Sequence, residues 1–291
     1  MKHLIGMQSN TYIADNEFKI DFAKFKEYGI DCLDYQNLME VNGEIPLLKL
    51  PEEEFVAFFD RLKKEIDKYG LRINQLHSLW DPVYEYNHQN EDMIVYFERA
   101  ILAASILKTK YVVMHTVPLK GHYLWENVPY QEIFNYNKEF VNRLLPLAKK
   151  SGVYLAIENL PFLGLPEFFS PTGTLKLIND INDENVVMCL DTGHFNMFKE
   201  EKIYDFLVNS NGKVQCLHIH DNNGQSDAHQ IPYLGNFDWN MFIKGLKDSN
   251  FQGVLSLETK IPNNKLNEKA YQSLNEGLIA IIKDMRDQLD N

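Results

Sequence analysis

Short runs of β-branched and aromatic residues alternate along the chain with longer stretches in which apolar residues recur every three to four positions. The first pattern is typical of buried strands and the second of amphipathic helices. Eight runs are predicted as strands: residues 3–8, 32–36, 71–77, 111–115, 153–158, 186–191, 214–218 and 254–258. A helical pattern follows each of them, over residues 18–28, 52–69, 91–107, 131–150, 174–181, 203–209, 239–249 and 267–289.

Eight strand-then-helix units in one chain predict a parallel sheet that closes into a (β/α)₈ TIM barrel, as a single domain over residues 1–291. Glycines stand just ahead of five predicted strands, where a helix C-cap glycine is expected: Gly29, Gly70, Gly152, Gly212 and Gly253. The alternative is a doubly wound sheet. The nearly even units and the lack of a glycine-rich first turn favour the barrel.

The charge and composition of the chain limit the classes of binding partner and of cellular location that we expect. The chain has 29 Lys and Arg against 41 Asp and Glu, a net charge of −12, and no basic stripe, which disfavours nucleic acid. Residues 1–10 show no signal-peptide pattern, and no apolar run is long enough for a membrane span. Cys32, Cys189 and Cys216 are widely spaced and are expected to be reduced core residues. We therefore expect a cytoplasmic protein, and a homo-oligomer stays open.

Six consecutive predicted strands end in, or just beyond, a side chain of the kind that binds metals: His77, His115, Glu158, Asp191, His218 and Glu258. In a barrel these strand ends meet at one mouth. Crowded carboxylates repel one another, and a divalent cation removes that penalty. The pattern predicts a Zn, Mn or Mg centre without an organic cofactor.

Two motifs extend the predicted cluster. LDTGHF places His194 three residues after Asp191, and LHIHDNNGQSDAH adds Asp227 and His229 in the loop after the seventh strand. Taken singly, an Asp after a strand is more often a helix cap, and a strand-end His is more often a hydrogen-bonded structural residue. The shared position at one mouth favours ligands. His220, two residues after His218, is expected to support the ligands or the fold. Trp80 and Trp125 are candidates for a pocket wall.

The segments QLHS, VVMHT, AIEN, CLDTGH, LHIHDNNGQSDAHQIPYLGNFDW and SLE resemble the xylose isomerase-like barrels over essentially the whole chain. This superfamily contains sugar isomerases, ketose 3-epimerases, inosose dehydratases and the endonuclease IV class of abasic-site nucleases. The chain most resembles its sugar phosphate isomerase/epimerase group.

Resemblance to the epimerase branch implies one metal ion held by Glu158, Asp191, His218 and Glu258. The two glutamates would also exchange a proton with the carbon beside the substrate carbonyl. His194, His77 and Trp80 are the expected contacts to a small sugar substrate. The chain departs from that branch near Gly224, where no arginine is available to grip substrate hydroxyls.

Resemblance to the nuclease branch implies three zinc ions held by nine residues, all of which have counterparts here: His77, His115, Glu158, Asp191, His194, His218, Asp227, His229 and Glu258. Against this branch, the loop NLPFLGLPEFFSP after the fifth strand lacks comparable glycines and any basic run. The leading hypothesis is a metal-dependent sugar isomerase or epimerase. The alternatives are a trinuclear-zinc phosphodiesterase acting on abasic DNA and a non-catalytic sugar-binding or structural barrel.

Overall fold

Eight parallel strands form one sheet in the computed structural model, which describes residues 2–40, 44–79, 93–117, 129–161, 165–261 and 266–291. The strands are β1 (Ile5–Gln8), β2 (Cys32–Tyr35), β3 (Arg72–His77), β4 (Tyr111–Met114), β5 (Tyr154–Glu158), β6 (Val186–Asp191), β7 (Val214–His218) and β8 (Leu255–Leu257). Their order is β7-β6-β5-β4-β3-β2-β1-β8, so consecutive strands are neighbours and β1 pairs with β8. The predicted single-domain (β/α)₈ barrel is confirmed.

The ring closes between β7 and β8 through one residue beyond the end of β7. Ile219 forms a parallel bridge with Leu257, its N–H donates to the carbonyl of Ser256 at 2.8 Å, and its carbonyl accepts the N–H of Glu258 at 3.0 Å. The strands therefore make a nearly closed barrel.

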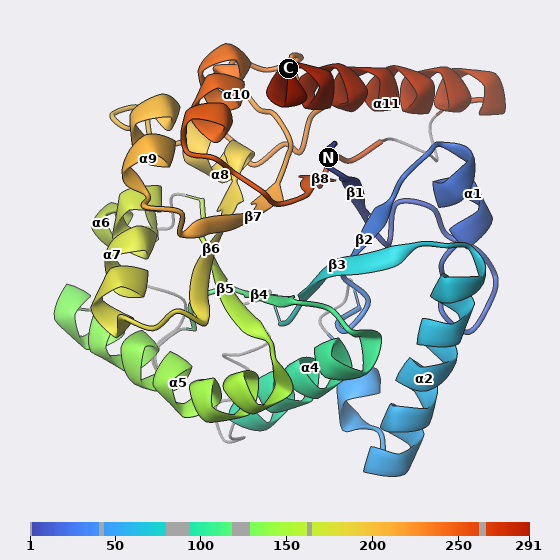
Figure 1. The fold of residues 1–291 in the computed structure, drawn as a ribbon, viewed down its shortest axis with the longest axis horizontal. Helices are drawn as coiled ribbons and strands as arrows, with labels where there is room; N and C mark the ends of the chain where they lie inside the picture. Colours follow the sequence, from blue (N-terminus) through green and yellow to red (C-terminus); the bar gives the residue numbers. More distant parts are fainter. Residues whose placement is uncertain (1, 41–43, 80–92, 118–128, 162–164, 262–265) are drawn as a thin grey trace.

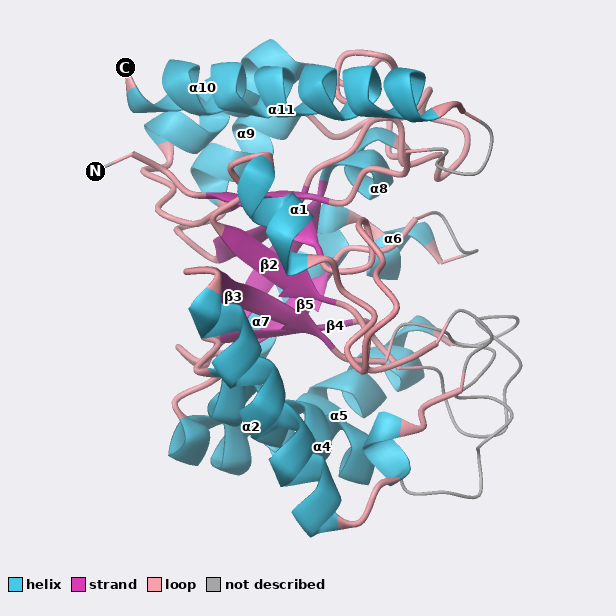
Figure 2. Ribbon diagram, turned by 90° about the vertical axis from the view of Figure 1, so that its right-hand side faces the viewer, coloured by secondary structure: helices cyan, strands magenta, loops and turns pink. Residues whose placement is uncertain are grey.

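Helices surround the strands (Figure 1), and the loops after the strands gather on the side opposite the chain termini (Figure 2). The helices are α1 (Phe22–Glu27), the 3₁₀ turn η1 (Leu47–Lys49), α2 (Glu52–Lys68), α4 (Ile94–Leu107), α5 (Tyr130–Ser151), α6 (Pro166–Phe169), α7 (Pro171–Ile181), α8 (Thr192–Asn196), α9 (Ile203–Asn209), α10 (Trp239–Asp248) and α11 (Glu268–Asp290). Because each strand runs toward the loop side, the carboxyl ends of the strands define one mouth. In the described segments, no helix is both long and apolar enough to cross a bilayer.

The predicted helix over residues 18–28 is shorter than expected. Lys19 adopts a left-handed φ of +56°, and α1 begins only after Asp21, whose carboxylate accepts the N–H of Lys24. The side chain of Asn16 holds the preceding turn by accepting the N–H groups of Phe18 and Ile20. Local side-chain hydrogen bonds of this kind compete with the first helical turn. The apolar pattern therefore predicted a helix that begins too early.

The expected role of the glycines holds at Gly152, which ends α5 with a φ of +68°. At Gly253 the prediction was wrong, because Asn250 supplies the left-handed residue after α10, with a φ of +56°. Gly253 is constrained by space instead. A β-carbon there would lie 2.6 Å from the carbonyl oxygen of Gln215 on β7.

A separate small core fills the barrel interior: Tyr111, Val113, Ala156, Val187, Cys189 and Cys216. The three cysteines are buried and free, as predicted. The members of this core on β4, β5 and β6 alternate with residues that face the helices, as the two-residue period of a strand requires. The same phase, continued toward the carboxyl ends, turns Glu158 and Asp191, the last residues of β5 and β6, toward the barrel axis.

Candidate metal and active site

The alternation of β5 and β6 brings two carboxylates into the mouth of the barrel. Ala156 and Val187 face the interior core, so Glu158 and Asp191, at the ends of their strands, face the same axis. His218 ends β7 two residues after the interior Cys216. All three are buried: Glu158 is 2% exposed, and Asp191 and His218 are fully buried. Polar groups withdrawn so far from water must find partners in the protein or in a bound ion.

Glu158 is surrounded by imidazoles on both of its oxygens. Its Oε2 lies 3.1 Å from Nε2 of His77 and 3.3 Å from Nε2 of His115. Its Oε1 lies 3.0 Å from Nδ1 of His218 and 3.6 Å from Nδ1 of His194. One carboxylate thus contacts imidazoles from the ends of β3, β4 and β7 and from helix α8.

The four residues expected to hold a single ion do converge. Glu158, Asp191, His218 and Glu258 each offer one ligand atom, and these four atoms all lie within 4.8 Å of one another. Nδ1 of His218 is 3.2 Å from Oε2 of Glu258, as well as 3.0 Å from Glu158. We call these four residues the central cluster.

Asp227 gathers the remaining predicted ligands beside the central cluster. Its Oδ2 lies 3.0 Å from Nε2 of His229 and 3.5 Å from Nε2 of His194. Nδ1 of His229 faces the carbonyl of Glu258 at 2.8 Å, which ties the loop after β7 to the end of β8. All nine residues of the larger predicted set therefore meet at the mouth.

His220 lies deeper in the cluster than the sequence suggested. It is fully buried, its Nε2 is 2.8 Å from Oδ2 of Asp191, and its ring stacks on that of His229 with centroids 4.1 Å apart. Oδ1 of Asp191 accepts the N–H of His194 at 2.6 Å. Both oxygens of Asp191 are thereby fixed. Nδ1 of His220 has no hydrogen-bond partner among the described residues.

Burial and charge shift the pKa values of this site in opposite directions. Although burial alone would raise the pKa of Glu158, His218 and the neighbouring imidazoles hold it well below its usual value. Although burial alone would lower the pKa of His194, Asp191, Asp227 and Glu158 raise it to about 10. The pKa of His115, in contrast, is lowered, because burial outweighs its contact with Glu158.

The pKa of His218 is raised well above its usual value, against the effect of burial. Cys189 acts in this direction only as a thiolate, and burial raises the pKa of its own thiol, so it is neutral at pH 7. The carboxylates of Glu158 and Glu258 are therefore the physical cause at neutral pH.

The donor set fits a divalent cation. Four carboxylates, on Glu158, Asp191, Asp227 and Glu258, meet at one mouth, and in the described part of the chain their ion-pair partners are imidazoles, with no lysine or arginine among them. Imidazole nitrogens with carboxylate oxygens are ligands for Zn²⁺ and Mn²⁺. Nε2 of the buried His220, 2.8 Å from Oδ2 of Asp191, is a further candidate donor beside the same carboxylates.

Two residues of the site escaped sequence reasoning. Asp34, near the end of β2, is 1% exposed and faces His218, and Gln36, two residues later, donates to Glu258 at 2.8 Å. The second strand does not end in a ligand-type residue, and the alternation of Cys32, Asp34 and Gln36 was the available signal. Trp80 and Trp125, proposed as pocket walls, lie outside the described residues.

Asp221, in the HDN motif, organises the loop after β7. Its carboxylate accepts the indole N–H of Trp239 at 2.9 Å and the backbone N–H groups of Asn222, Gly235 and Phe237. This fully buried carboxylate holds the loop that carries Asp227 and His229. Its role is architectural, because its acceptor positions are filled by the loop.

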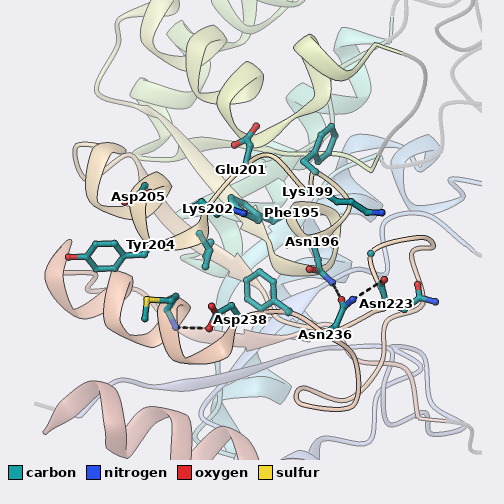
Figure 3. Close-up of a pocket in the computed structure, with 15 residues that line it drawn as sticks. Phe195, Asn196, Lys199, Glu201, Lys202, Tyr204, Asp205, Asn223, Asn236 and Asp238 are labelled. Atoms are coloured by element: carbon teal, nitrogen blue, oxygen red, sulfur yellow. Dashed lines mark hydrogen bonds between the residues drawn. The ribbon is translucent and has the colours of Figure 1, made fainter.

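Two pockets are lined by segments that also carry residues of the site, α8 and the end of β2. One, of about 600 Å³, lies between α8, α9 and α10 and is lined by Asn196, Lys202, Tyr204 and Met241, among others (Figure 3). It contains none of the nine clustered residues, so the chemistry lies elsewhere. The second, of about 470 Å³, is lined by Gln36 and by apolar residues such as Phe58. Gln36 connects this space to Glu258.

Sequence relatives match part of the chain. MJ1311, an uncharacterised protein of Methanocaldococcus jannaschii, is 29% identical over 162 residues, which cover 55% of this chain and 54% of the relative. MJ1614, an uncharacterised protein of the same organism, is 30% identical over 165 residues, covering 56% and 61% respectively. The matched region thus spans about half to three fifths of these relatives.

Solved structures share the fold over nearly the whole chain. The 3-keto-D-glucoside 4-epimerase YcjR of E. coli has a TM-score of 0.74 at 16% identity, covering 97% of this chain and 100% of its own. An L-ribulose 3-epimerase has a TM-score of 0.74 at 18% identity, covering 100% and 96%. The IolI protein with a bound zinc atom has a TM-score of 0.71 at 20% identity, covering 99% and 98%.

The sequence itself, without any structural superposition, matches a protein-family model. A family model described as a xylose isomerase-like TIM barrel matches residues 22–278, which include every residue of the central cluster. The resemblance inferred from the sequence motifs is confirmed, and the chain belongs to the xylose isomerase-like TIM barrel family.

Proposed function

We propose that the protein is a divalent-metal-dependent isomerase or epimerase that acts on a small sugar or sugar derivative. One observation carries the proposal: Glu158 and Glu258, from different strands, each turn an oxygen toward Nδ1 of His218, at 3.0 and 3.2 Å. Two carboxylates on either side of one ligand site are what a proton exchange at carbon requires. The epimerases among the similar structures support the same reaction class.

The central cluster would hold the ion through Glu158, Asp191, His218 and Glu258. When bound, a divalent ion would polarise the carbonyl and the adjacent hydroxyl oxygen of a ketose and so acidify the C–H bond of the carbon that carries the hydroxyl. One glutamate would take the proton from that carbon, and the other, after gaining a proton from solvent, would return one to the opposite face. Each glutamate keeps a second oxygen on another side: Glu158 toward His77 and His115, and Glu258 toward Gln36.

In this proposal His194 contacts a substrate hydroxyl. Its Nδ1 lies 2.8 Å from the carbonyl of Asn159, which favours the proton on that nitrogen, and its Nε2 faces Asp227. The raised pKa of His194 keeps the ring a donor on both nitrogens at neutral pH. The same ring near Glu158 is thus suited to orient a hydroxyl beside the proton-exchanging carboxylate.

Solvent exchange tests the proposal. The protein, loaded with Mn²⁺, Mg²⁺ or Zn²⁺ in turn, is incubated in D₂O with D-fructose, D-tagatose, D-psicose and L-ribulose. Deuterium is expected at the carbon beside the carbonyl of any sugar that is converted, and mass spectrometry with NMR detects it. Conversion of a sugar without deuterium incorporation at that carbon would exclude proton exchange by the glutamates.

A second function is favoured by a different observation. Beside the central cluster, His77 and His115 share Oε2 of Glu158, and His194 and His229 flank Asp227. Together with the central cluster, these two groups make three sets of donors around acidic residues. Three such sets suit a trinuclear zinc centre of the kind that cleaves abasic DNA. The net charge of −12 opposes a polyanionic substrate.

Metal content separates the two functions. The epimerase proposal expects about one ion per chain, and the nuclease alternative expects about three, as measured by elemental analysis of the purified protein. Three ions together with salt-sensitive nicking of an abasic duplex would replace the epimerase proposal with the nuclease one. A single ion without nicking would remove the nuclease alternative.

A further inference from the structure

The end of β2 contributes two side chains that contact the central cluster from behind. Asp34 is 1% exposed, and its Oδ2 lies 3.0 Å from Nε2 of His218, the ring nitrogen that does not face Glu158 and Glu258. The amide nitrogen of Gln36 donates both to Oδ2 of Asp34, at 3.0 Å, and to Oε1 of Glu258, at 2.8 Å.

These contacts close a ring of four side chains. Asp34 contacts His218, His218 contacts Oε2 of Glu258, Gln36 binds Oε1 of the same carboxylate, and Gln36 returns to Asp34. The ring joins β2 to the two strand ends on either side of the seam of the barrel, β7 and β8. The proposed functions given above use only two of its members, His218 and Glu258.

The chemistry of imidazole explains what Asp34 does in this ring. A neutral imidazole offers a lone pair on one nitrogen only, and the partner of the other nitrogen decides which one. A carboxylate at Nε2 keeps the proton there, so Nδ1 presents its lone pair to the cluster. The N–H is not aligned for a linear hydrogen bond, so the 3.0 Å contact is electrostatic. Oδ1 of Asp34 has no hydrogen-bond partner in the described structure, so His218 and Gln36 are the polar partners of this carboxylate.

Gln36 performs the matching task for Glu258. An amide N–H on Oε1 fixes the rotation of the carboxylate, so that Oε2 remains toward Nδ1 of His218. A glutamine is suited to this because its two donor hydrogens reach Asp34 and Glu258 together without adding a charge.

We infer that Asp34 and Gln36 are positioning residues, which hold His218 and Glu258 with Nδ1 and Oε2 turned toward a shared metal ion. The inference rests on the metal site of the proposed function, but it is independent of which sugar is the substrate. Partners of this kind typically change metal affinity by about 10- to 100-fold when removed.

The test measures the affinity for Zn²⁺ alone, by competition with a chromophoric chelator, so that no turnover is needed. Asp34→Ala is expected to weaken binding by about 10- to 100-fold, and Asp34→Asn, which keeps an acceptor, by less. Asp31→Asn is the matched control, because Asp31 precedes the opposite end of β2 and its Oδ2 accepts the N–H of Ile5 at 3.0 Å. Its affinity for Zn²⁺ is expected to equal that of the unmodified protein.

A double-mutant cycle distinguishes positioning from general support of the fold. In a His218→Ala background, Asp34→Ala is expected to cause no further loss of Zn²⁺ affinity, because the imidazole that Asp34 positions is absent. The same substitution in a His77→Ala background is expected to keep its full effect. An equal loss in both backgrounds would mean that Asp34 acts through the fold, and would overturn the inference.

If Asp34→Ala does not fold, Asp34→Asn and Gln36→Leu carry the test, with Glu258→Gln as the partner of Gln36 in the cycle. Unchanged Zn²⁺ affinity in folded variants would overturn the inference and leave the proposed function intact. An unmodified protein that binds no divalent ion would instead remove the proposed function, and the inference with it.

Discussion

Gly193 packs against the ring of His220, so closely that a β-carbon at position 193 would stand 2.0 Å from Cε1 of the imidazole. The ring cannot retreat, because it stacks on His229 on one side and contacts Asp191 through Nε2. The glycine of the DTGH motif is therefore a packing requirement of the site. It is the neighbour of a ligand candidate without being one itself.

Gly193→Ala is expected to displace His220 and, with it, Oδ2 of Asp191. We expect destabilisation of about 1–3 kcal/mol, as for overpacking of a core, together with weaker Zn²⁺ binding. Thermal unfolding and chelator competition measure the two effects. Gly277→Ala is the control, because a β-carbon there meets nothing within 4 Å in α11, and it should stabilise the helix by up to about 1 kcal/mol. Equal behaviour of the two variants would contradict the packing argument.

Glu258→Gln is expected to lower the turnover of a converted sugar by about 10²- to 10⁴-fold, the usual contribution of a proton-transferring side chain. The substitution is mild in geometry, because the amide oxygen of a glutamine still accepts the N–H of Gln36. Deuterium incorporation in D₂O is the measurement, with exposed Glu132 of α5 changed to Gln as the control. A rate within about threefold of the original would take the proton-transfer role away from Glu258.

Metal binding is expected to release protons at pH 7. The pKa values of His77, His194 and His218 are raised by neighbouring carboxylates against the effect of burial, to about 10 for His194. His218 is the imidazole of the central cluster, and a metal ligand must be deprotonated, so its raised pKa means that the ring loses a proton when the ion binds. Because a raised pKa means that the proton is lost only at higher pH, affinity should fall as the pH falls from about 8 to 6. Titration calorimetry in buffers of different ionisation enthalpy measures the release, and identical heats in all buffers would count against it.

Asp221→Ala is expected to cost about 2–4 kcal/mol of stability, because it leaves the indole of Trp239 and three backbone N–H groups without their acceptor. Asp238→Ala, in the same loop, removes only the N-cap of α10 and should cost about 1 kcal/mol. Denaturant unfolding compares the two variants. A larger loss at Asp238 than at Asp221 would show that the loop is held in another way.

The repeating pattern of strands and helices was sufficient for the barrel, because each strand is buried and each helix has one apolar face. The central cluster could also be anticipated, since ligand-type residues stood at the ends of consecutive strands. The conformation of the loops could not be predicted from the sequence. His220 looked like a supporting residue because its distance from Asp191 depends on how the loop after β7 folds back. Asp34 was missed because it stands within its strand and not at the strand end, so only the alternation of Cys32, Asp34 and Gln36 indicated which way it faces.

The seam of the barrel gives the proposed metal site a mechanical meaning. Every other pair of neighbouring strands is joined over three or four registered residue pairs, whereas among the described residues one bridge, from Ile219 just beyond β7 to Leu257, joins β7 to β8. His218 and Glu258 stand on either side of that bridge. An ion bound by both residues would cross-link the ends of β7 and β8. Metal binding should therefore slow amide exchange at Ile219, so that closure of the barrel depends on metal occupancy.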